Sequence, residues 1–509
     1  MDAAVARDRD LSRLAEAPYD VAILGGGVSG AAVFRELRAR GHRALLVDRG
    51  DFASGTSQAS GMLVWGGLLY LRRLELRTVR ALSLERDALL SAAARDVRLA
   101  PFRYLALKHG GRSPWLVRCA LELYWWLGSR RRARPRWTSR VPSLVRGARF
   151  RGALTYEEGA LERSDARLVL DWILDSEDEH RAALNHVEAT GARRERGLWH
   201  LDLEDRRSPA RATVKARVIV NAAGVWADAL AARFGVETHH KHVLSKGVYL
   251  GLARPPELAE FLAFEMGAHG DTQTFTPWGP VALWGPTETP LESLDGAFEP
   301  NVEDVRFLLD QARRNLAQPI DVGDVVSVRT GVRPLAVERA YSKDVYPLDL
   351  SRKHVVDVDR ARAALTLYGG KITSAGAFAR EAADVIERDV PGRFARTMTP
   401  PETPRETPSA TPPETLRFPG LEAPLLDPAY ARDRERCLTL VDYIRRRTNV
   451  AQWVPRWGLG ASDAREPDLR AIAEVLHSAA PDGADTAAAD LAEVRRLAAR
   501  QDALLAAAD

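Results

Sequence analysis

Residues 19–48 of the chain, YDVAILGGGVSGAAVFRELRARGHRALLVD, decide its fold class. The run 19–24 favours a β-strand, a glycine-rich turn follows at once, and residues 31–40 then have the composition of a helix that Gly41 closes. A second buried-strand pattern ends at Asp48. Strand, turn, helix and strand in this order predict a βαβ unit, and therefore an α/β protein with a parallel, Rossmann-like sheet.

The glycine-rich turn has the spacing G-x-G-x-x-G at Gly25, Gly27 and Gly30. The first glycine permits the tight bend, the second lets the backbone approach a pyrophosphate, and the third lets the helix pack closely on the strand. The helix N-terminus would then offer unpaired N–H groups to phosphates. Asp48 follows Gly30 by 18 residues, where a carboxylate can accept hydrogen bonds from a ribose. The pattern therefore predicts a dinucleotide site.

Two later strand–turn units indicate that the nucleotide domain is discontinuous. Residues 217–221 form a strand pattern before the turn at 222–224, and residues 364–368 precede the turn at 369–371 and a predicted helix over 373–389. We therefore predict a discontinuous nucleotide-binding domain that comprises residues 19–80, 141–240 and 331–395.

The remaining stretches predict three further parts. Residues 241–330, with an insertion at 81–140, alternate short apolar runs with Pro and Gly and suit an antiparallel-sheet substrate domain. Residues 396–420 are dense in Pro, Thr and Glu, which predicts a semi-extended linker that packs poorly. Residues 421–509 predict a C-terminal helical cap domain. One apolar helix face in it is expected to contain Leu469, Ile472, Val475 and Leu476.

The composition excludes several classes of protein. The 509 residues are 46% hydrophobic and 28% charged, which is typical of a globular chain with a large core. Cys119 and Cys437 are too few for a disulfide framework or a four-cysteine metal centre, and no metal is expected. A net charge of +4 gives no reason to expect nucleic-acid binding. Residues 1–18 lack the apolar segment of a signal peptide, and no apolar run reaches 18 residues, so we expect a cytoplasmic chain, in solution or peripheral on the inner membrane.

Motifs along nearly the whole chain resemble the FAD-dependent glycerol-3-phosphate dehydrogenases, within the wider glycine/D-amino-acid oxidase family of flavoproteins. The resemblance implies that FAD is the cofactor and that the discontinuous Rossmann-like domain binds it. Besides residues 19–48, the matching segments are TSQASGMLVWGGLLY at 56–70, SDARLVL at 164–170, VNAAGVWAD at 220–228, TGVRPL at 330–335, LYGGKIT at 367–373 and YIRRRT at 443–448.

The resemblance also implies roles for single residues. Arg333, Lys371 and Tyr70 are expected at the catalytic centre. Lys371, where a turn enters a helix, would place positive charge beside the reduced flavin, unless it is a surface lysine. Arg333 could bind phosphate or carboxylate through paired hydrogen bonds, or form a structural salt bridge. Tyr70 would bind a substrate oxygen or pack on the flavin. The residues expected to bind FAD are Gly25, Gly27, Gly30, Asp48, Thr56, Ser57, Gly66, Gly67, Ala222, Gly224, Gly370, Lys371 and Thr373.

Four positions depart from the family's pattern. Where the family has a lysine, two histidines and an arginine, this chain has Met62, Trp65, Tyr249 and Leu69. Each change removes a cationic or titratable group, and charge-assisted contacts to phosphate contribute about 1.5–3 kcal/mol each. Tyr249 and Lys246 remain candidates for substrate contact. Because a phenol is a poor general base at neutral pH, the candidates for the missing base are His239, His240, His242 and His269.

The activity that the resemblance implies is oxidation of sn-glycerol 3-phosphate to dihydroxyacetone phosphate, with electrons passed to a quinone or another acceptor. A second interpretation keeps the flavin but makes the substrate a 2-hydroxy acid or an amino acid, whose carboxylate Arg333 would bind. A third interpretation is a non-catalytic flavin-binding module. The four departures do not decide among these substrates. They do not change the expectation that the chain binds a flavin.

Residues 113–140 combine a Trp-rich apolar stretch with clustered arginines. Trp125 and Trp126 suit a membrane interface, and the arginines would attract anionic lipid. The family resemblance implies a peripheral membrane protein in the same way. A core helix followed by a solvated basic loop explains the pattern equally well. The sequence leaves the oligomeric state open, a homodimer included. The arginines are Arg130, Arg131, Arg132, Arg134, Arg136 and Arg140.

Overall fold

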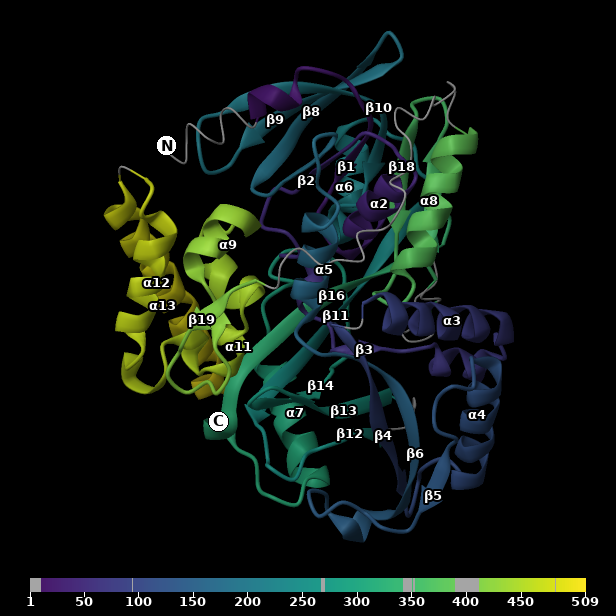
Figure 1. Cartoon of the computed structure of the whole chain (residues 1–509). Coiled ribbons are helices and arrows are strands. Elements are labelled where there is room, and N and C mark those ends of the chain that lie inside the picture. Colours follow the sequence, from purple (N-terminus) through teal and green to yellow (C-terminus); the bar gives the residue numbers. More distant parts are fainter. Residues whose placement is uncertain are drawn as a thin grey trace.

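The computed structural model describes residues 11–93, 95–266, 271–341, 350, 353–389, 412–480 and 482–509. In these residues the chain forms two large β-sheets and a C-terminal group of helices that lies beside both (Figure 1). The predicted α/β fold class is confirmed, because a largely parallel sheet with helices on its face is joined to a largely antiparallel one.

The first sheet contains the predicted βαβ unit. Its central strand, β1 (Tyr19–Leu24), pairs in parallel with β2 (Ala44–Val47) on one side and with β10 (Arg211–Asn221) on the other. Every residue of β1 and β2 is buried, as expected for central strands that are covered on both faces. The other strands are β7 (Arg181–Leu184), β18 (Ala364–Tyr368), β17 (Val355–Asp359), β8 (Val187–Glu195) and β9 (Leu198–Asp205).

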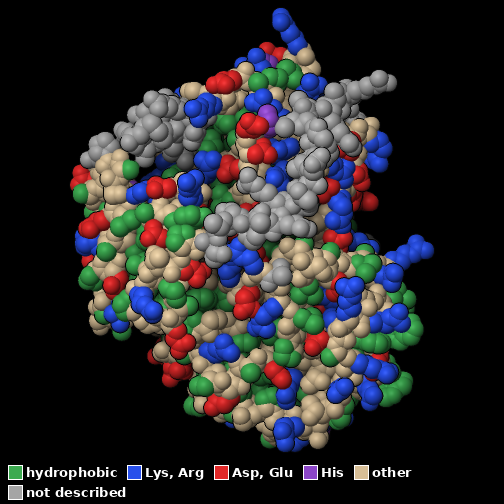
Figure 2. Space-filling view, in the orientation of Figure 1, with side chains coloured by type: hydrophobic (Ala, Val, Ile, Leu, Met, Phe, Trp, Pro, Cys, Tyr) green, Lys and Arg blue, Asp and Glu red, His purple; other side chains and the backbone are tan. Residues whose placement is uncertain are grey.

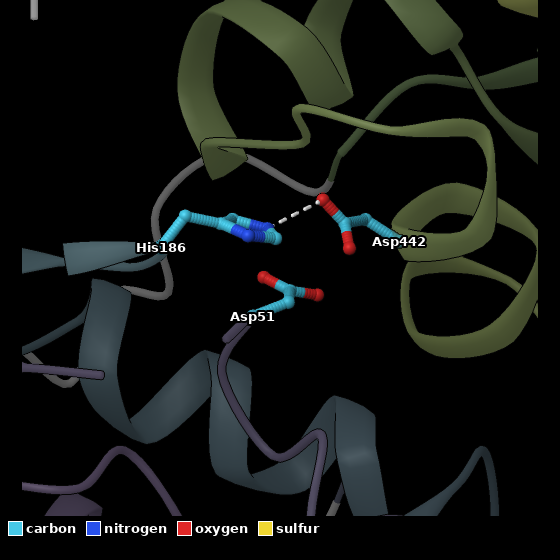
Figure 3. A group of neighbouring side chains, drawn as sticks. All are labelled: Asp51, His186 and Asp442. Carbon is cyan, nitrogen blue, oxygen red and sulfur yellow. Dashed lines mark hydrogen bonds and ion pairs between the residues drawn. The ribbon is translucent and has the colours of Figure 1, made fainter. Parts of the chain in front are cut away.

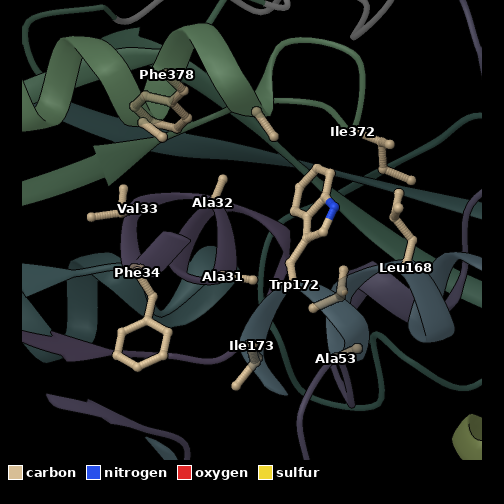
Figure 4. Close-up of a cluster of buried hydrophobic side chains, with 14 of the residues drawn as sticks. Ala31, Ala32, Val33, Phe34, Ala53, Leu168, Trp172, Ile173, Ile372 and Phe378 are labelled. Carbon is tan, nitrogen blue, oxygen red and sulfur yellow. The ribbon is translucent and has the colours of Figure 1, made fainter. Parts of the chain in front are cut away.

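Three helices, α2 (Val28–Ala39), α5 (Asp165–Leu174) and α8 (Ala375–Asp389), pack on one face of this sheet. Figure 4 shows the cluster that they form with the strands, including Phe34, Trp172 and Phe378. Alternate residues of the same strands point to the opposite face, where the β8–β9 hairpin and α6 (Ala227–Arg233) cover them. Both faces of the sheet are therefore covered by apolar contacts. The ends of the strands are the part of the sheet that remains open to a ligand.

The second sheet is largely antiparallel, as predicted for the substrate domain. The helix α7 (Val302–Asn315) covers it through the buried residues Val305, Leu308 and Leu309. Its strands are β15 (Thr289–Leu291), β11 (His240–Ala253), β14 (Val281–Gly285), β13 (Asp271–Trp278), β12 (Phe261–Met266), β4 (Val97–Leu107), β6 (Phe150–Leu161), β3 (Leu63–Val64), β16 (Val325–Glu338) and β5 (Arg136–Thr138).

The boundary between the sheets differs from the predicted division of the chain at β3, which lies in the segment 19–80 but pairs with β6 in the second sheet, and at two longer strands. The segment 141–240 was assigned to the nucleotide domain, but β6 pairs with β4 along its whole length in the second sheet. After β2, the chain returns to the first sheet only at β7, which follows α5. Likewise β16 is one strand paired with β11 throughout, so the predicted boundary at residue 331 falls inside it. Both ladders join residues far apart in the sequence, which local patterns do not encode.

The C-terminal domain is helical, with α9 (Pro428–Glu435), α10 (Leu440–Asp442), α11 (Val450–Trp453), α12 (Glu466–His477) and α13 (Gly483–Ala508) around one apolar core. Leu469, Ile472 and Leu476 are buried in it as predicted, whereas Val475 is 37% exposed. Most of the predicted linker 396–420 lies outside the described residues. Its last part, 412–420, packs on the domain, since β19 (Glu414–Leu416) pairs with β20 (Leu425–Leu426) and Phe418 is buried.

Two further helices, α3 (Leu76–Ala92) and α4 (Pro114–Leu127), lie at the far side of the second sheet from the C-terminal domain (Figure 1). Among the residues that the structure describes, no helix has both the length and the apolar character needed to cross a membrane.

Candidate active site

A cavity of about 760 Å³ opens where the parallel strands of the first sheet end. The segments that follow β1, β2, β10 and β18 line this cavity. The first sheet therefore brings together turns that are up to about 350 residues apart in the sequence. The predicted FAD-binding residues that line it are Gly25, Gly27, Asp48, Thr56, Ser57, Ala222, Gly224, Gly370, Lys371 and Thr373.

Three predicted glycines lie elsewhere. Gly30 does not line the cavity but lets α2 reach it, because a Cβ at Gly30 would lie 1.9 Å from the carbonyl oxygen of Gly25. Gly25 itself has φ +119°, and a Cβ there would meet the Ala222 carbonyl at 2.5 Å. Gly66 and Gly67 lie under α3 instead, with the amide of Gly66 facing the buried carboxylate of Glu158. Their small size permits the close packing of this segment against α3, and neither residue lines the cavity.

The N-terminus of α2 points into the cavity. Gly27 is its N-cap, no side chain caps it from that position, and Gly27, Val28 and Ser29 all line the cavity. The Val28 amide donates to the Ser57 hydroxyl at 2.9 Å, which ties the loop after β2 to the helix start. A helix N-terminus with exposed amides favours a bound anion such as a pyrophosphate.

Asp48 directly follows β2, next to the glycine turn. Its carboxylate accepts hydrogen bonds from the amides of Gly26 at 2.6 Å and Gly50 at 2.8 Å. Burial raises the pKa of Asp48 to about 6 in spite of these two bonds. The side chain lines the cavity, where the remaining acceptor sites of the carboxylate can meet ribose hydroxyls.

Asp48→Asn is expected to change how the stability of the ligand-free protein depends on pH. Because the pKa is raised, the folded state disfavours the carboxylate. Its contribution to stability is complete below the unfolded pKa of about 4 and is lost as pH rises through about 6, a change of about 3 kcal/mol. The free energy of unfolding of Asp48→Asn minus that of the unaltered chain should therefore rise by about this amount from pH 4 to pH 7. Urea unfolding across this range measures it.

Asp310→Asn, on an exposed side chain of α7, is the matched control and should show no such rise. If the difference in free energy of unfolding between Asp48→Asn and the unaltered chain stays constant with pH, the raised pKa of Asp48 is contradicted.

Lys371 lies in the turn between β18 and α8, which Gly369 and Gly370 form with φ of +69° and +97°. Its ammonium donates to the Tyr70 hydroxyl at 2.9 Å and lies 4.5 Å from the centre of that ring. Tyr70 is 7% exposed. The structure therefore joins two of the three residues predicted for the catalytic centre.

A second cavity, of about 730 Å³, adjoins the first. Tyr70 lines only this second cavity, whereas Arg333 and Lys371 line both. All three predicted catalytic residues thus lie at or beside the junction of the two cavities. The residues common to both linings are Gly61, Leu63, Trp65, Tyr249, Arg333 and Lys371.

Arg333 projects from β16 over Gly247 of the neighbouring strand, where a Cβ would lie 2.1 Å from its Nη2. Its guanidinium lies 3.2 Å from the carboxylate of Glu288 and 3.4 Å from the carbonyl oxygen of Thr287. Glu288 also accepts a hydrogen bond from the buried Ser245 hydroxyl and lines the second cavity. Glu288 is not among the residues predicted from the sequence, where its only signal is a charged residue in the short connection between β14 and β15.

The residues that replace the family's polar groups lie in different places. Trp65 and Tyr249 line the junction of the cavities, and Leu69 lies at the second cavity with 37% of its surface exposed. Met62 is buried in the core and lines neither cavity. Within the described residues, the indole N–H of Trp65 is buried without a hydrogen-bond partner, so it is available to an acceptor on a bound molecule.

Lys246 does not line either cavity. It is buried, and its ammonium lies 2.6 Å from the carboxylate of Asp304, which does line the second cavity. Lys246 would therefore act on a bound substrate indirectly, by neutralising the Asp304 carboxylate that lines the second cavity.

None of the three described histidines that were considered as bases lines either cavity. His239 and His240 both bind the carboxylate of Asp357, at 3.0 and 2.9 Å. His242 is buried against Tyr368, accepts a hydrogen bond from the Gly369 amide, and has its pKa lowered to about 4 by burial. His269 lies outside the described residues. The structure therefore places none of the first three candidates at either cavity.

The cavities fit FAD in their chemistry. The first offers a glycine cradle, a helix N-terminus for a pyrophosphate and a carboxylate for a ribose. Its far end offers the ammonium of Lys371 and the indole N–H of Trp65 to a ring with several acceptor atoms.

Comparison with known proteins agrees with this geometry. The sequence model of the family "FAD dependent oxidoreductase" (DAO) matches residues 20–385. D-erythritol 1-phosphate dehydrogenase of Brucella abortus is 31% identical over 364 residues, which cover 70% of this chain and 71% of that protein. Glycerol-3-phosphate dehydrogenase of Pseudomonas aeruginosa is 29% identical over 383 residues, with coverage of 70% and 69%.

Solved structures show the same fold. Glycerol-3-phosphate dehydrogenase from Bacillus halodurans complexed with FAD has a TM-score of 0.69 at 19% identity and covers 98% of both chains. L-α-glycerophosphate oxidase from Mycoplasma pneumoniae with FAD bound has a TM-score of 0.56 at 17% identity and covers 73% of this chain and 95% of its own.

Proposed function

The chain belongs to the FAD-dependent oxidoreductase family, and from that premise we propose that it oxidises sn-glycerol 3-phosphate to dihydroxyacetone phosphate. FAD is its cofactor. The observation that carries the proposal is the junction of the two cavities, where Arg333 and Lys371 face a chamber beside the cofactor cavity.

FAD, when bound, supplies the acceptor for the hydride that leaves the carbinol carbon. Lys371 and the amides of its turn would stabilise the negative charge that a reduced flavin carries. Arg333 would bind the substrate phosphate through paired, charge-assisted hydrogen bonds and so orient the carbinol carbon toward the ring. The large second cavity leaves room for a polyol chain between these groups.

The hydroxyl proton also needs an acceptor, and we assign it to Glu288. Among the described carboxylates of the second cavity, Asp304 is neutralised by Lys246, and Glu303 is exposed at the start of α7. Glu288 lies beside Arg333, so a substrate oxygen near that guanidinium is within reach of its carboxylate.

Glu288→Gln is expected to slow reduction of the bound FAD by substrate about 10²-fold, since the amide keeps the shape of the side chain but accepts no proton. Anaerobic stopped-flow measurements of flavin absorbance provide the rate. Glu303→Gln, in the same cavity, is the control. Reduction of Glu288→Gln at the rate of the unaltered chain would refute the assignment.

A second candidate substrate is a 2-hydroxy acid or an amino acid. It is favoured by the apolar residues Trp65 and Leu69 beside the second cavity and by Glu288, which partly neutralises Arg333. A singly charged carboxylate needs fewer cations than a phosphate dianion. An acidic wall would also suit an ammonium group.

We propose a quinone as the electron acceptor and an anionic membrane as the place of its exchange. Trp115, Leu116 and Trp126 of α4 are 73%, 56% and 62% exposed. Figure 2 shows hydrophobic side chains next to basic ones along the edge where Figure 1 places α4. Exposed indoles beside arginines suit the interface of an anionic bilayer.

The test is anaerobic titration of the purified yellow protein with glycerol 3-phosphate, erythritol phosphate, a 2-hydroxy acid and an amino acid. We expect glycerol 3-phosphate to bleach the flavin absorbance, and a soluble quinone analogue to restore it. Bleaching by the carboxylated compounds alone would replace the first candidate with the second.

A further inference from the structure

Three consecutive arginines of the C-terminal domain are buried at its contact with the cofactor domain. Arg445, Arg446 and Arg447 lie on one π-helical turn, η7 (Tyr443–Arg447), and are 7%, 6% and 5% exposed. A buried guanidinium is stable only where acceptors meet its donors. The partners of these three arginines therefore show what the turn holds.

All three reach the same short segment, residues 51–60, which we name the cofactor loop. Arg446 Nε donates to Asp51 at 2.5 Å, and its Nη1 donates to the Gln58 side chain at 3.2 Å. Arg447 Nη2 donates to the other oxygen of Asp51 at 3.0 Å. Arg445 Nη2 donates to the Gln58 carbonyl at 2.7 Å. The turn thus grips the loop near both of its ends.

The other side of the cofactor loop lines the first cavity, where FAD would bind. Ser54, Gly55, Thr56 and Ser57 all line the cofactor cavity between the two gripped residues. The amide of Ala53 donates to the Gly26 carbonyl at 2.9 Å, which links the loop to the glycine turn. Within the loop, the side-chain amide of Gln58 donates through Nε2 to the Ser54 carbonyl at 2.5 Å. A shift of Asp51 or Gln58 would therefore move a wall of the cavity.

A second row of contacts supports the grip. Figure 3 shows Asp442 of the C-terminal domain next to His186 and Asp51 of the cofactor domain. His186 Nε2 lies 3.0 Å from Asp442, which also accepts from Arg446 Nη2 at 2.5 Å. His186, Asp51 and Asp442 lie close enough to resemble a metal site, but both Asp51 oxygens already accept arginine donors. The guanidinium groups of Arg446 and Arg447, and not a metal ion, therefore supply the positive charge next to Asp51.

We propose that Arg445, Arg446 and Arg447 clamp the cofactor loop, so that retention of FAD depends on the docked C-terminal domain. The coupling is reciprocal: whatever the docked domain adds to FAD affinity, bound FAD adds to the docking. These arginines are positioning residues, since they contact the loop and not the cavity. The proposal rests on FAD as the cofactor and is independent of which alcohol or acid is oxidised.

The first test follows loss of FAD from diluted holoenzyme by the rise of free flavin fluorescence. We expect Arg446→Met to release FAD 10- to 100-fold faster, and Arg445→Met several-fold faster. Arg446→Met leaves Asp51 paired with Arg447 and Asp442 paired with His186, so no carboxylate loses all its partners. Arg495→Met is the matched control, because Arg495 pairs with Glu466 inside the same domain on its exposed face. Unchanged release from folded Arg446→Met and Arg445→Met would overturn the proposal.

The second test needs no substitution and so does not depend on a variant that folds. Amide hydrogen exchange is compared between the holoenzyme and the protein stripped of FAD. The clamp predicts that FAD slows exchange at residues 440–449, in the C-terminal domain, at least threefold as well as at the cofactor loop. Protection confined to the cofactor domain would show that the arginines only support the fold, and would overturn the proposal.

Discussion

Arg333→Ala is expected to lower the second-order rate constant for reduction of the bound FAD by about 10²–10⁴-fold, while FAD stays bound. The guanidinium can make two charge-assisted hydrogen bonds to a phosphate or carboxylate, and each contributes about 1.5–3 kcal/mol. Together they account for the expected loss, because every 1.36 kcal/mol changes a rate tenfold. The glycine turn, the α2 N-terminus and Asp48, which line the first cavity, would hold the cofactor without Arg333.

Stopped-flow reduction at a series of substrate concentrations measures the effect, and the flavin absorbance of the purified variant measures FAD content. Arg339→Ala is the control, because Arg339 follows the same strand but pairs with Asp228 at an exposed site. Full reduction by Arg333→Ala at unchanged substrate concentration would contradict the assigned role.

The parts of the fold that the sequence predicts are those encoded locally. The βαβ unit follows from apolar runs and a glycine spacing inside 30 residues, and Gly25 and Gly30 have the close backbone approaches that this spacing implies. The turn at Lys371 is predicted for the same reason, since strand, glycines and helix adjoin each other. Neither prediction needs knowledge of a distant residue.

Positions set by long ladders are harder to predict. Between residues 240 and 251, β11 pairs with β16 without a bulge, so its side chains alternate strictly between two faces. Tyr249 shares one face with Gly247 and Ser245, toward Arg333 and Glu288, whereas His240, His242 and Lys246 point to the other. His240 and His242 were candidate bases because of their residue type, and the strand register turns them away from the cavities.

Contacts between domains leave even less trace in the sequence. The motif YIRRRT reads as an exposed basic stretch, yet its arginines are buried because Asp51 and Gln58 meet them across nearly 400 residues of chain. Glu288 is similar, because its importance depends on Arg333 in a neighbouring strand. A single sequence does not reveal such pairs, since each partner alone has the pattern of an ordinary surface charge.

Lys371→Met is expected to slow reduction of FAD by substrate about 10²–10³-fold and to lower the midpoint potential of the bound flavin by about 65–85 mV. Reduction adds negative charge to the flavin, and a fixed ammonium in a water-poor site is worth about 3–4 kcal/mol to such a charge. For a two-electron couple 30 mV corresponds to about 1.4 kcal/mol, so the shift in potential accounts for most of the loss in rate. Methionine keeps the length of the side chain and removes only the charge and the hydrogen bond to Tyr70.

Two measurements distinguish this role from a structural one. Spectroelectrochemical titration gives the potential, and it should shift in Lys371→Met but stay constant in Tyr70→Phe, which removes the same hydrogen bond and keeps the ammonium. Lys353→Met is the surface control, because Lys353 is 53% exposed and pairs with Glu75. A potential that moves equally in Lys371→Met and Tyr70→Phe would assign the effect to the hydrogen bond. A potential that moves in neither would place the ammonium too far from the ring to act on its charge, and the electrostatic argument for Lys371 would then fail.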